Sequence, residues 1–385
     1  MAPWPCSNMG VLGNCGEGGI MPFILDDRLE LHMGPSSLGA PDDLEKVIVD
    51  FIDQAKSSLD VAAQEIESRP IAEALVRARQ RGLRIRLVLE QDYLREARPP
   101  ADPFAVGGAV EENRNLFAAM LRAGIDARAD YNPDIFHQKF IIRDSGGTRR
   151  ALLTGSTNFT PTGTGNHGSR KNLNHLVVVH NQWICNEYDD EFAEIWQGTF
   201  GKVRNRHEPS PRKNKVSGIC VRALFAPDHA PEMEIMKQIL KAKERVDFAI
   251  FTFAKSSGID DTLVAMARGG IKIRGIFDAG QGNRDWAATR MVADGGGEAY
   301  LASRRNGLGK LHHKLMVIDG ALLICGSFNY TDPANRLNDE NILVIGDLED
   351  EDPLAQAAQR RFAAFALAEI DRMIDAHGVA VPLSG

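Results

Sequence analysis

Two stretches of the chain carry the same pattern of polar residues. Residues 136–158 read FHQKFIIRDSGGTRRALLTGSTN, and residues 311–329 read LHHKLMVIDGALLICGSFN. Each begins with a histidine and a lysine two positions apart and ends with a serine and an asparagine two positions apart. Side chains two apart lie on the same face of a β-strand, so each stretch presents its four polar groups together. These groups belong to His137, Lys139, Ser156 and Asn158 in the first stretch, and to His312, Lys314, Ser327 and Asn329 in the second.

The combination of imidazole, ammonium, hydroxyl and amide is suited to a phosphate anion. Lysine supplies a charge and three donors, and serine and asparagine add neutral donors, so both serines are candidate substrate-binding residues. Neutral imidazole is a competent nucleophile towards phosphorus, and protonated imidazole can protonate a leaving oxygen. Two histidines in one site would therefore divide phosphodiester hydrolysis into formation and hydrolysis of a phosphohistidine. The lysines and asparagines would stabilise charge on the phosphoryl oxygens.

An aspartate follows each histidine–lysine pair at the same spacing. Asp144 precedes the turn-forming run Ser145-Gly146-Gly147, and Asp319 precedes Gly320 in a sequence typical of a two-residue hairpin. Both aspartates have the strand parity opposite to that of the histidines. We therefore interpret them as structural turn and capping residues rather than reacting groups.

The elements around these stretches are also repeated. Residues 57–91 and 243–279 each read as a strand, a helix, a glycine and a second strand, which predicts a βαβ unit with parallel strands. A strand and a helix close each half, at 176–179 and 185–197 and again at 342–345 and 353–374. The predicted divisions are a flexible tail at 1–21, a first half at 22–200, a basic linker at 201–218, a second half at 219–377, and a C-terminal tail at 378–385.

Composition limits the possible classes of protein. The chain has 385 residues, of which 43% are hydrophobic and 25% charged, so it is neither disordered, collagenous nor a coiled coil. No run approaches the roughly 18 apolar residues of a membrane span, which predicts a protein without stable membrane insertion. The first 21 residues have no lysine or arginine and no continuous apolar core, unlike a signal peptide, so we expect a cytoplasmic location. The five cysteines are too scattered for a disulfide framework or a zinc site. A net charge of -7 means that any polyanion must bind to a local patch.

The doubled HxKx4D pattern, followed each time by GSxN, resembles that of the phospholipase D superfamily, over about residues 40–375. The run GSFNYTDPANRLNDENILVI in the second half most resembles the bacterial Nuc-type endonuclease branch. The resemblance implies two similar α/β halves, each a mixed, mostly parallel sheet flanked by helices. These halves pack pseudo-symmetrically with one active site between them. It also implies a phosphohistidine mechanism with no metal and no cofactor.

The two halves differ after their GSxN motifs. Glu340 stands where the family places a carboxylate that orients a histidine, and the aligned residue of the first half is Asn174, or Asn172 if the alignment slips by two. A carboxylate partner favours imidazolium. We therefore expect Glu340 to keep His312 protonated as the acid and later the base, and an amide partner to leave His137 neutral as the nucleophile.

Two classes of substrate fit this chemistry. Nucleic acid, either DNA or RNA, is favoured by the Nuc-like second half, by the basic linker and by basic residues near the motifs. Those residues are Arg149, Arg150, Arg170, Lys171, Arg304, Arg305 and Lys310. The alternative is a phospholipase D or phosphatidyltransferase acting on glycerophospholipids. A catalytically dead binding protein is a third possibility, which the two intact motifs disfavour. One chain contains both motifs, so a monomer is sufficient to form the active site. His167 and His175 are expected in loops or at the surface.

Overall fold

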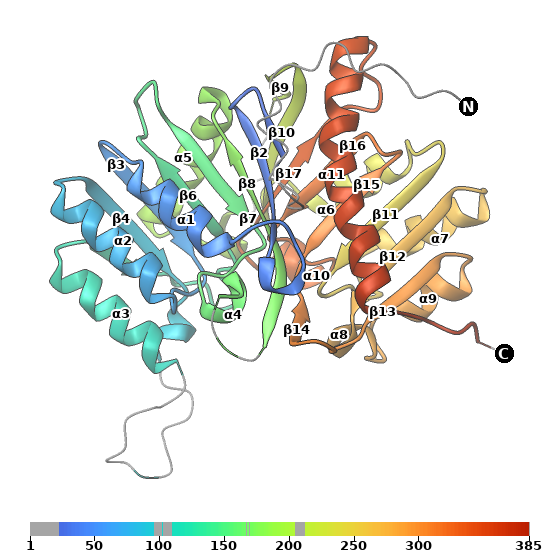
Figure 1. Ribbon diagram of the computed structural model, residues 1–385, viewed down its shortest axis with the longest axis horizontal. Helices are drawn as coiled ribbons and strands as arrows, with labels where there is room; N and C mark the ends of the chain where they lie inside the picture. The colour runs from blue at the N-terminus through green and yellow to red at the C-terminus, as the bar shows by residue number, and fades with distance from the viewer. Residues whose placement is uncertain are drawn as a thin grey trace.

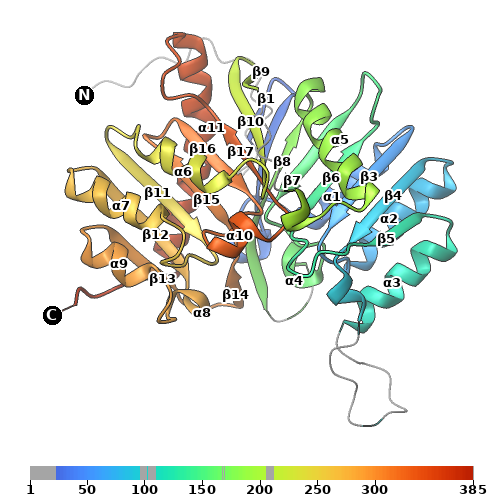
Figure 2. The same cartoon turned by 180° about the vertical axis from the view of Figure 1, so that it is seen from behind.

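The computed structural model describes residues 23–95, 102, 110–166, 168, 170–204 and 212–384. The predicted tail at 1–21 lies outside the described residues, as does His167. Two β-sheets lie side by side, and helices cover both faces of each (Figures 1 and 2). The prediction of two similar α/β halves is therefore confirmed.

The first sheet has the strand order β1-β2-β8-β7-β6-β3-β4-β5, with β14 paired to β8. The strands are β1 (Phe23–Leu25), β2 (Leu29–Gly34), β3 (Ser58–Ala63), β4 (Arg84–Leu89), β5 (Asp126–Ala129), β6 (Lys139–Arg143), β7 (Ala151–Gly155), β8 (Lys171–Val179) and β14 (Leu308–Leu311). Its helices are α1 (Leu44–Asp53), α2 (Arg69–Gln80), α3 (Glu111–Arg122), α4 (Pro161–Thr164) and α5 (Gln182–Gln197). Short 3-10 turns occupy Ser36–Leu38, Gln91–Leu94 and Gly201–Arg204.

The second sheet has the order β18-β13-β12-β11-β15-β16-β17-β10-β9. The strands are β9 (Asn214–Val216), β10 (Ile219–Ala226), β11 (Arg245–Ile250), β12 (Lys272–Asp278), β13 (Glu298–Ala302), β15 (Lys314–Ile318), β16 (Leu322–Gly326), β17 (Glu340–Ile345) and β18 (Gly378–Ala380). The helices are α6 (Pro231–Ile239), α7 (Ile259–Arg268), α8 (Ala279–Gly282), α9 (Thr289–Asp294), α10 (Asp332–Arg336) and α11 (Pro353–His377).

The predicted majority of parallel strands is wrong. Parallel pairing joins β3 to β4, β4 to β5 and β14 to β8 in the first sheet, and β11 to β12 and β12 to β13 in the second. The other ladders between the described strands are antiparallel. The physical reason is that βαβ crossovers produce parallel neighbours, whereas the hairpin in each half and the strand that closes it pair antiparallel.

Three short strands do not fit the predicted division of the chain into a linker, a tail and two separate halves. Strand β9 falls within the predicted linker and pairs with β10, while residues 205–211 lie outside the described residues. Strand β18 falls within the predicted C-terminal tail and pairs with β13. Strand β14 belongs to the second half by sequence but pairs with β8 of the first sheet, so it links the two halves.

One hydrophobic core extends across both halves. Tyr188 on α5 packs edge-on against Phe140 of β6 at 5.0 Å and against Phe225 of β10 at 4.9 Å between ring centroids. Buried residues of α11 belong to the same cluster as those of α5. Edge-on aromatic pairs of this kind add specific geometry to a large buried apolar area. The core therefore holds the two sheets together as well as covering each of them.

Each hairpin is held at its turn by the motif aspartate. Asp144 has a φ of 55° and Asp319 a φ of 50°, and Gly320 continues with 58°, as the predicted two-residue turn requires. Asp144 Oδ1 accepts hydrogen bonds from the backbone N–H groups of Lys56, Ser57 and Ser58, which lead into β3. The carboxylate of Asp319 accepts from the N–H groups of Lys243, Glu244 and Arg245, which lead into β11.

Among the described residues, no helix has the length and apolar character needed to cross a bilayer. The cysteines that the structure describes, Cys185, Cys220 and Cys325, are buried free thiols, and Cys6 and Cys15 lie outside the described residues.

Candidate active site

The two histidine–lysine motifs meet where the halves join. His137 and His312 are each 6% exposed, Lys139 is 1% exposed and Lys314 is 2% exposed. The backbone N–H group of each motif histidine forms a hydrogen bond to the opposite half. The N–H of His137 donates to Asp339 O at 3.0 Å, and the N–H of His312 donates to Leu173 O at 2.9 Å. These four of the predicted catalytic side chains therefore belong to one buried site.

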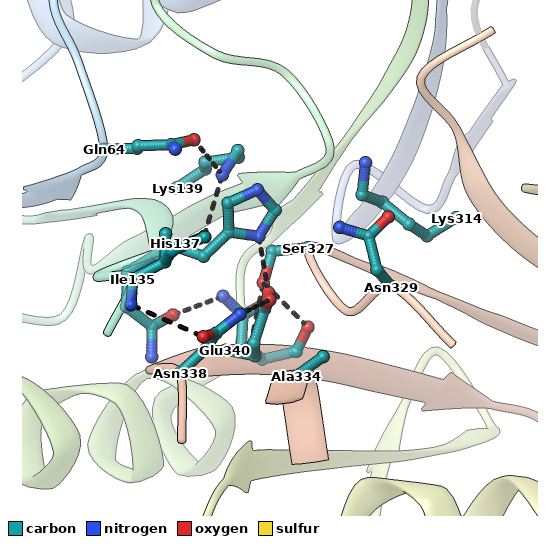
Figure 3. Close-up of polar contacts among 12 residues, drawn as sticks. Gln64, Ile135, His137, Lys139, Lys314, Ser327, Asn329, Ala334, Asn338 and Glu340 are labelled. Carbon is teal, nitrogen blue, oxygen red and sulfur yellow. Dashed lines mark hydrogen bonds and ion pairs between the residues drawn. The ribbon is translucent and has the colours of Figure 1, made fainter. Parts of the chain in front are cut away.

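The partners of the histidines come from the opposite halves, which corrects the predicted assignment. Glu340 does not contact His312 but accepts a hydrogen bond from His137 Nδ1 at 2.7 Å (Figure 3). His312 Nδ1 instead lies 2.9 Å from Asn174 Oδ1 and 3.1 Å from Ser156 O. The alignment of the motifs within each half was sound, but the halves face each other, so each partner reaches across the interface.

The strand register shows that Asn174 is the counterpart of Glu340. In the first half Ser156 N donates to His175 O, and in the second half Ser327 N donates to Asn341 O. The residues that precede these two acceptors are Asn174 and Glu340. Asn172 instead pairs with Lys310 of β14, so the alternative alignment is excluded.

The glycine of each GSxN motif allows this close approach of strands. Gly155 has a φ of 155°, and a Cβ atom there would lie 2.3 Å from His175 O. Gly326 has a φ of 151°, and its Cβ would lie 2.3 Å from Asn341 O. A side chain at either position would separate the motif from the strand that carries the histidine partner.

Both serines are fully buried behind the histidines. Ser156 Oγ donates to Asn174 Oδ1 at 2.8 Å, and Ser327 Oγ donates to Glu340 Oε2 at 2.6 Å. Each hydroxyl also accepts from the backbone of the closing strand. The structure thus places the predicted substrate-binding serines against the partners of the histidines, where they fix the partner side chains.

Both histidines present Nδ1 to acceptors, so Nδ1 carries the hydrogen and Nε2 the lone pair. Burial lowers the pKa of His137 to about 4, although the charge of Glu340 raises it. Burial also lowers the pKa of His312 well below its usual value, and Lys314 and Lys139 lower it further. Both imidazoles are therefore neutral at neutral pH before an anion binds.

The two lysines carry buried amino groups with few partners. Lys139 Nζ donates to His137 O at 2.8 Å and to Gln64 Oε1 at 3.2 Å. Lys314 Nζ donates to His312 O at 2.8 Å and lies 5.1 Å from the centre of the Phe251 ring. Burial lowers the pKa of Lys139 to about 7 and that of Lys314 well below its usual value. Such groups favour an anion between them, because it would restore their charged forms.

The two asparagines have different contacts. Asn158 Nδ2 donates to Glu65 Oε1 at 2.5 Å, and Asn329 Oδ1 accepts from the backbone N–H of Thr252 at 3.3 Å.

Among the residues that the structure describes, no group of three or more histidine, cysteine, aspartate or glutamate side chains could hold a metal ion.

Sequence reasoning missed residues that follow β3 and β11. Ala63 pairs with Lys139 and Ile250 pairs with Lys314, so Gln64 and Phe251 lie beside the lysines. Glu65, the next residue after Gln64, was missed as well. The repeat contains a signal for these residues. When residues 57–91 are aligned with residues 243–279, Gln64 and Phe251 occupy the same position, so the two halves differ there.

The predicted basic rim is only partly assembled. Lys171 and Lys310 lie near the site on the paired strands β8 and β14. Arg149 and Arg150 follow the turn at the opposite end of β6 from Lys139, and Arg150 Nε donates to Gly147 O. The expectation for His175 is also wrong: it is fully buried against His313, because it faces the second half rather than a loop.

Comparison with known proteins agrees with this geometry. The family profile described as "Cardiolipin synthase, PLD-like domain" matches residues 48–196 and again residues 235–365, together more than half of the chain. The chain belongs to the phospholipase D superfamily. Its two matched segments coincide with the two halves that carry the motifs, and similar proteins are named as a cardiolipin hydrolase and a phospholipase D.

Relatives and solved structures differ in what their names say they do. A mitochondrial cardiolipin hydrolase from Chlamydomonas reinhardtii is 30% identical over 139 residues, 35% of this chain and 60% of that protein. A phospholipase D from Rickettsia felis is 26% identical over 37% of this chain and 59% of its own length. The chain thus spans about 60% of the length of each of these two relatives.

Phosphatidylserine synthase from Haemophilus influenzae shares the fold, with a TM-score of 0.63 and 13% identity over 94% of this chain and 89% of that one. The phospholipase D family member Nuc from Salmonella typhimurium has a TM-score of 0.37 and 21% identity, covering 43% of this chain and 99% of its own.

Proposed function

We propose that this protein hydrolyses a phosphodiester without a metal, through a phosphohistidine at His137. His137 Nε2 attacks phosphorus and forms the N–P bond, while the P–O bond to the leaving alcohol breaks and His312 gives that oxygen a proton. His312 then takes a proton from water, whose oxygen attacks phosphorus, and the N–P bond breaks to restore neutral His137. The observation that carries this proposal is the convergence of both histidines and both lysines in one buried site.

His137 remains the proposed nucleophile, for a different reason from that inferred from the sequence. Glu340 accepts from His137 Nδ1, which keeps Nε2 unprotonated for attack. Its negative charge also offsets the positive charge that the imidazole acquires when Nε2 is phosphorylated. His312 faces the neutral oxygens of Asn174 and Ser156, so it takes up a proton when the phosphodiester anion binds and releases it readily to the leaving group.

The test is hydrolysis of bis(p-nitrophenyl) phosphate in the presence of EDTA. The wild-type protein is expected to release p-nitrophenol, and His137→Ala and His312→Ala are each expected to lose about 10²-fold or more of that rate. Full activity in His137→Ala would contradict the proposal and favour a binding protein contaminated by another enzyme. Loss of wild-type activity in EDTA would contradict the metal-free mechanism.

Nucleic acid is the first proposed substrate. Lys171, Lys310 and the neighbouring Arg170 supply positive charge on the β8–β14 side of the site, and a strand bound there would dissociate as salt increases. One chain carries the whole site, so we propose that a monomer acts alone. The test is cleavage of single-stranded and double-stranded DNA and RNA with EDTA present.

Glycerophospholipid is the second proposed substrate. It is supported by the family profile, which is described by cardiolipin synthase, and by relatives named as cardiolipin hydrolase and phospholipase D. Phosphatidylcholine vesicles are assayed beside the nucleic acids. Hydrolysis of lipid without cleavage of any nucleic acid would overturn the first choice and support this one.

A further inference from the structure

The two halves contribute equivalent sides to the site that differ chemically. We call Gln64, Glu65 and Asn158 the first wall, and Phe251, Thr252 and Asn329 the second wall. The pairings of Ala63 with Lys139 and of Ile250 with Lys314 make Glu65 the counterpart of Thr252, and Gln64 the counterpart of Phe251. The first wall therefore carries an amide and a carboxylate where the second carries an aromatic ring and a hydroxyl. Because the backbone is equivalent in the two halves, this difference lies in the side chains alone.

The asparagines accentuate this difference. Asn158 uses Nδ2 on Glu65, and its Oδ1 is a buried acceptor without a hydrogen-bond partner. Asn329 has the opposite orientation, because its Oδ1 accepts from Thr252 and its Nδ2 is left to donate. Reversing the amide of Asn158 would place two acceptor oxygens together, so the contact with Glu65 determines its orientation. The first wall thus presents acceptors, and the second presents donors.

Positive charge gathers on the second wall. Lys310 Nζ lies 5.3 Å from the centre of the Phe251 ring, and Lys314 Nζ lies 5.1 Å from it. Phe251 also lies beside His312, with 4.7 Å between the ring centroids. The phosphate charge is therefore attracted to the lysines, while Glu65 and Asn158 Oδ1 are suited to a hydrogen-bond donor elsewhere on the substrate.

A hydroxyl fits these acceptors better than an ammonium does. Burial and the charge of Glu67 raise the pKa of Glu65 to about 7, whereas the positive charges of Lys139 and Lys310 lower it. The ammonium forms of these two lysines compensate the carboxylate, so a substrate ammonium would add a further positive charge and oppose their protonation. A neutral hydroxyl satisfies both acceptors without that cost.

We propose that Glu65 and Asn158 form a subsite that recognises a hydroxyl group on the alcohol portion of the phosphodiester. The inference rests on the proposed function and deepens it by naming a feature of the substrate. Two sources carry such a hydroxyl near the ester oxygen: the ribose 2′-OH of RNA and the glycerol head group of a phospholipid. DNA and phospholipids with a simple alkyl head group do not carry it.

The experiment compares substrates whose alcohol portion carries hydroxyl groups with counterparts that lack them next to the ester oxygen. RNA is paired with DNA of the same sequence, and phosphatidylglycerol vesicles are paired with phosphatidylpropanol vesicles. Within whichever pair the wild-type protein hydrolyses, kcat/KM is expected to favour the hydroxyl-bearing member by about 10- to 100-fold, the effect of one hydrogen bond to a charged group. Equal kcat/KM within that pair would overturn the inference.

Two variants separate the subsite from general electrostatics. Glu65→Gln removes the charge and is expected to reduce the preference for the hydroxyl-bearing member to within about threefold. Glu67→Gln removes the same charge two residues along the chain and is expected to keep the wild-type ratio. An unchanged ratio in Glu65→Gln, or an equal fall in both variants, would overturn the subsite.

The same experiment distinguishes failure of this inference from failure of the proposed function. Bis(p-nitrophenyl) phosphate carries no hydroxyl, so its hydrolysis by the wild-type protein and its loss in His137→Ala report the phosphodiesterase activity alone. Hydrolysis of that compound without hydroxyl preference in either pair would reject the subsite and leave the phosphodiesterase standing.

Discussion

At the scale of residues, the site consists of two histidines whose partners differ in charge. The spacing within HxK and GSxN was enough to predict which groups converge, because parity along a strand follows from the sequence. It was not enough to assign Glu340 to its histidine. That contact joins residues 203 positions apart and crosses between the halves, whereas the repeat aligns each half only with itself.

Replacing Glu340 by glutamine is the sharpest test of that contact. Glu340→Gln keeps the shape but removes the charge that opposes the positive N-phosphorylated imidazole, and its amide no longer fixes one tautomer of His137. We expect kcat for bis(p-nitrophenyl) phosphate to fall by about 10²- to 10⁴-fold. Ser327→Ala, which removes a neutral hydrogen bond to the same carboxylate, is the control and should cost much less. A kcat for Glu340→Gln within threefold of wild type would mean that Glu340 only supports the fold.

At the scale of elements, each motif is a hairpin joined to the start of a βαβ unit. The sequence predicted the turns from Asp-Gly and Ser-Gly-Gly, since left-handed backbone needs such residues. It also predicted the βαβ units, but overestimated the parallel pairing. A hydrophobic run does not show which strands will flank it in the sheet. The sequence therefore could not predict that β8 pairs antiparallel with β7, or that β17 pairs antiparallel with β16.

The motif aspartates are expected to act on stability. Asp144 is 4% exposed and accepts three backbone N–H groups, and these hydrogen bonds lower the pKa of its carboxyl although burial raises it. Asp144→Ala leaves those donors unpaired and should lower the free energy of unfolding by about 2–4 kcal/mol, measured by urea denaturation. Asp144→Asn keeps an acceptor oxygen and should lose less. Normal stability with lost activity in Asp144→Ala would instead place this aspartate in the chemistry.

Behind the active site, the halves are joined by two pairs of residues related by the pseudo-symmetry. Asn341 Nδ2 donates to Gln138 Oε1 at 2.6 Å. At the equivalent place, His175 and His313 stack with 5.4 Å between ring centroids and 3.2 Å between their Nδ1 atoms. One interface contact is therefore indifferent to pH and the other is not. The motif reads HQK at 137–139 and HHK at 312–314. The sequence alone does not show that the middle residue of the second motif, His313, faces His175.

This difference predicts a pH dependence of stability. Burial lowers the pKa of His175 to about 3 and lowers that of His313 as well. Unfolded histidine titrates near 6.5, so below about pH 6.5 the unfolded chain binds protons that the folded chain does not. Each histidine therefore contributes stability that is present above about pH 6.5 and is lost as pH falls below it, for His175 down to about pH 3, at up to about 1.4 kcal/mol per pH unit.

The double variant His175→Asn with His313→Gln installs the amide pair of the other half. Glu369 Oε1, 3.8 Å from His313 Nε2, offers the new glutamine an acceptor, as Glu191 does for Gln138. Urea denaturation at pH 7, 6, 5 and 4 should show a shallower loss of stability on acidification than in the wild-type protein. Parallel pH profiles for the two proteins would mean that other groups, such as His137 and His312, carry the whole effect.

At the scale of the whole molecule, the buried charges belong to a site that exists only when both halves are together. Lys139 and Lys314 come from different sheets. The charge of Lys139 lowers the pKa of His312 and of Lys314, and the charge of Lys314 lowers the pKa of His137. Composition concealed this, because a net charge of -7 says nothing of two ammonium groups buried at an interface. The repeat predicted the shared site, and the shared core around Tyr188 explains how the halves are kept in register.

Anion binding should therefore take up protons. The pKa of Lys139 is about 7 in the free site, and an anion between the lysines raises it, so a fraction of a proton or more enters when sulfate, which does not titrate in this range, binds at pH 7.5. Isothermal titration calorimetry in buffers of different ionisation enthalpy measures that number. Lys139→Met should reduce the uptake. Release of protons on binding would contradict the charge state assigned to the site.

The central claim is that His137 forms the covalent intermediate, and base-quenched trapping tests it most directly. The protein is mixed with a phosphodiester substrate and quenched with base within the first turnovers, because phosphohistidine survives alkali, and the modified peptide is located by mass spectrometry. The account predicts that the added group, the phosphoryl with its remaining ester substituent, lies on His137 in the wild-type protein and accumulates in His312→Ala. Modification of His312 alone, with His137 unmodified, would contradict it.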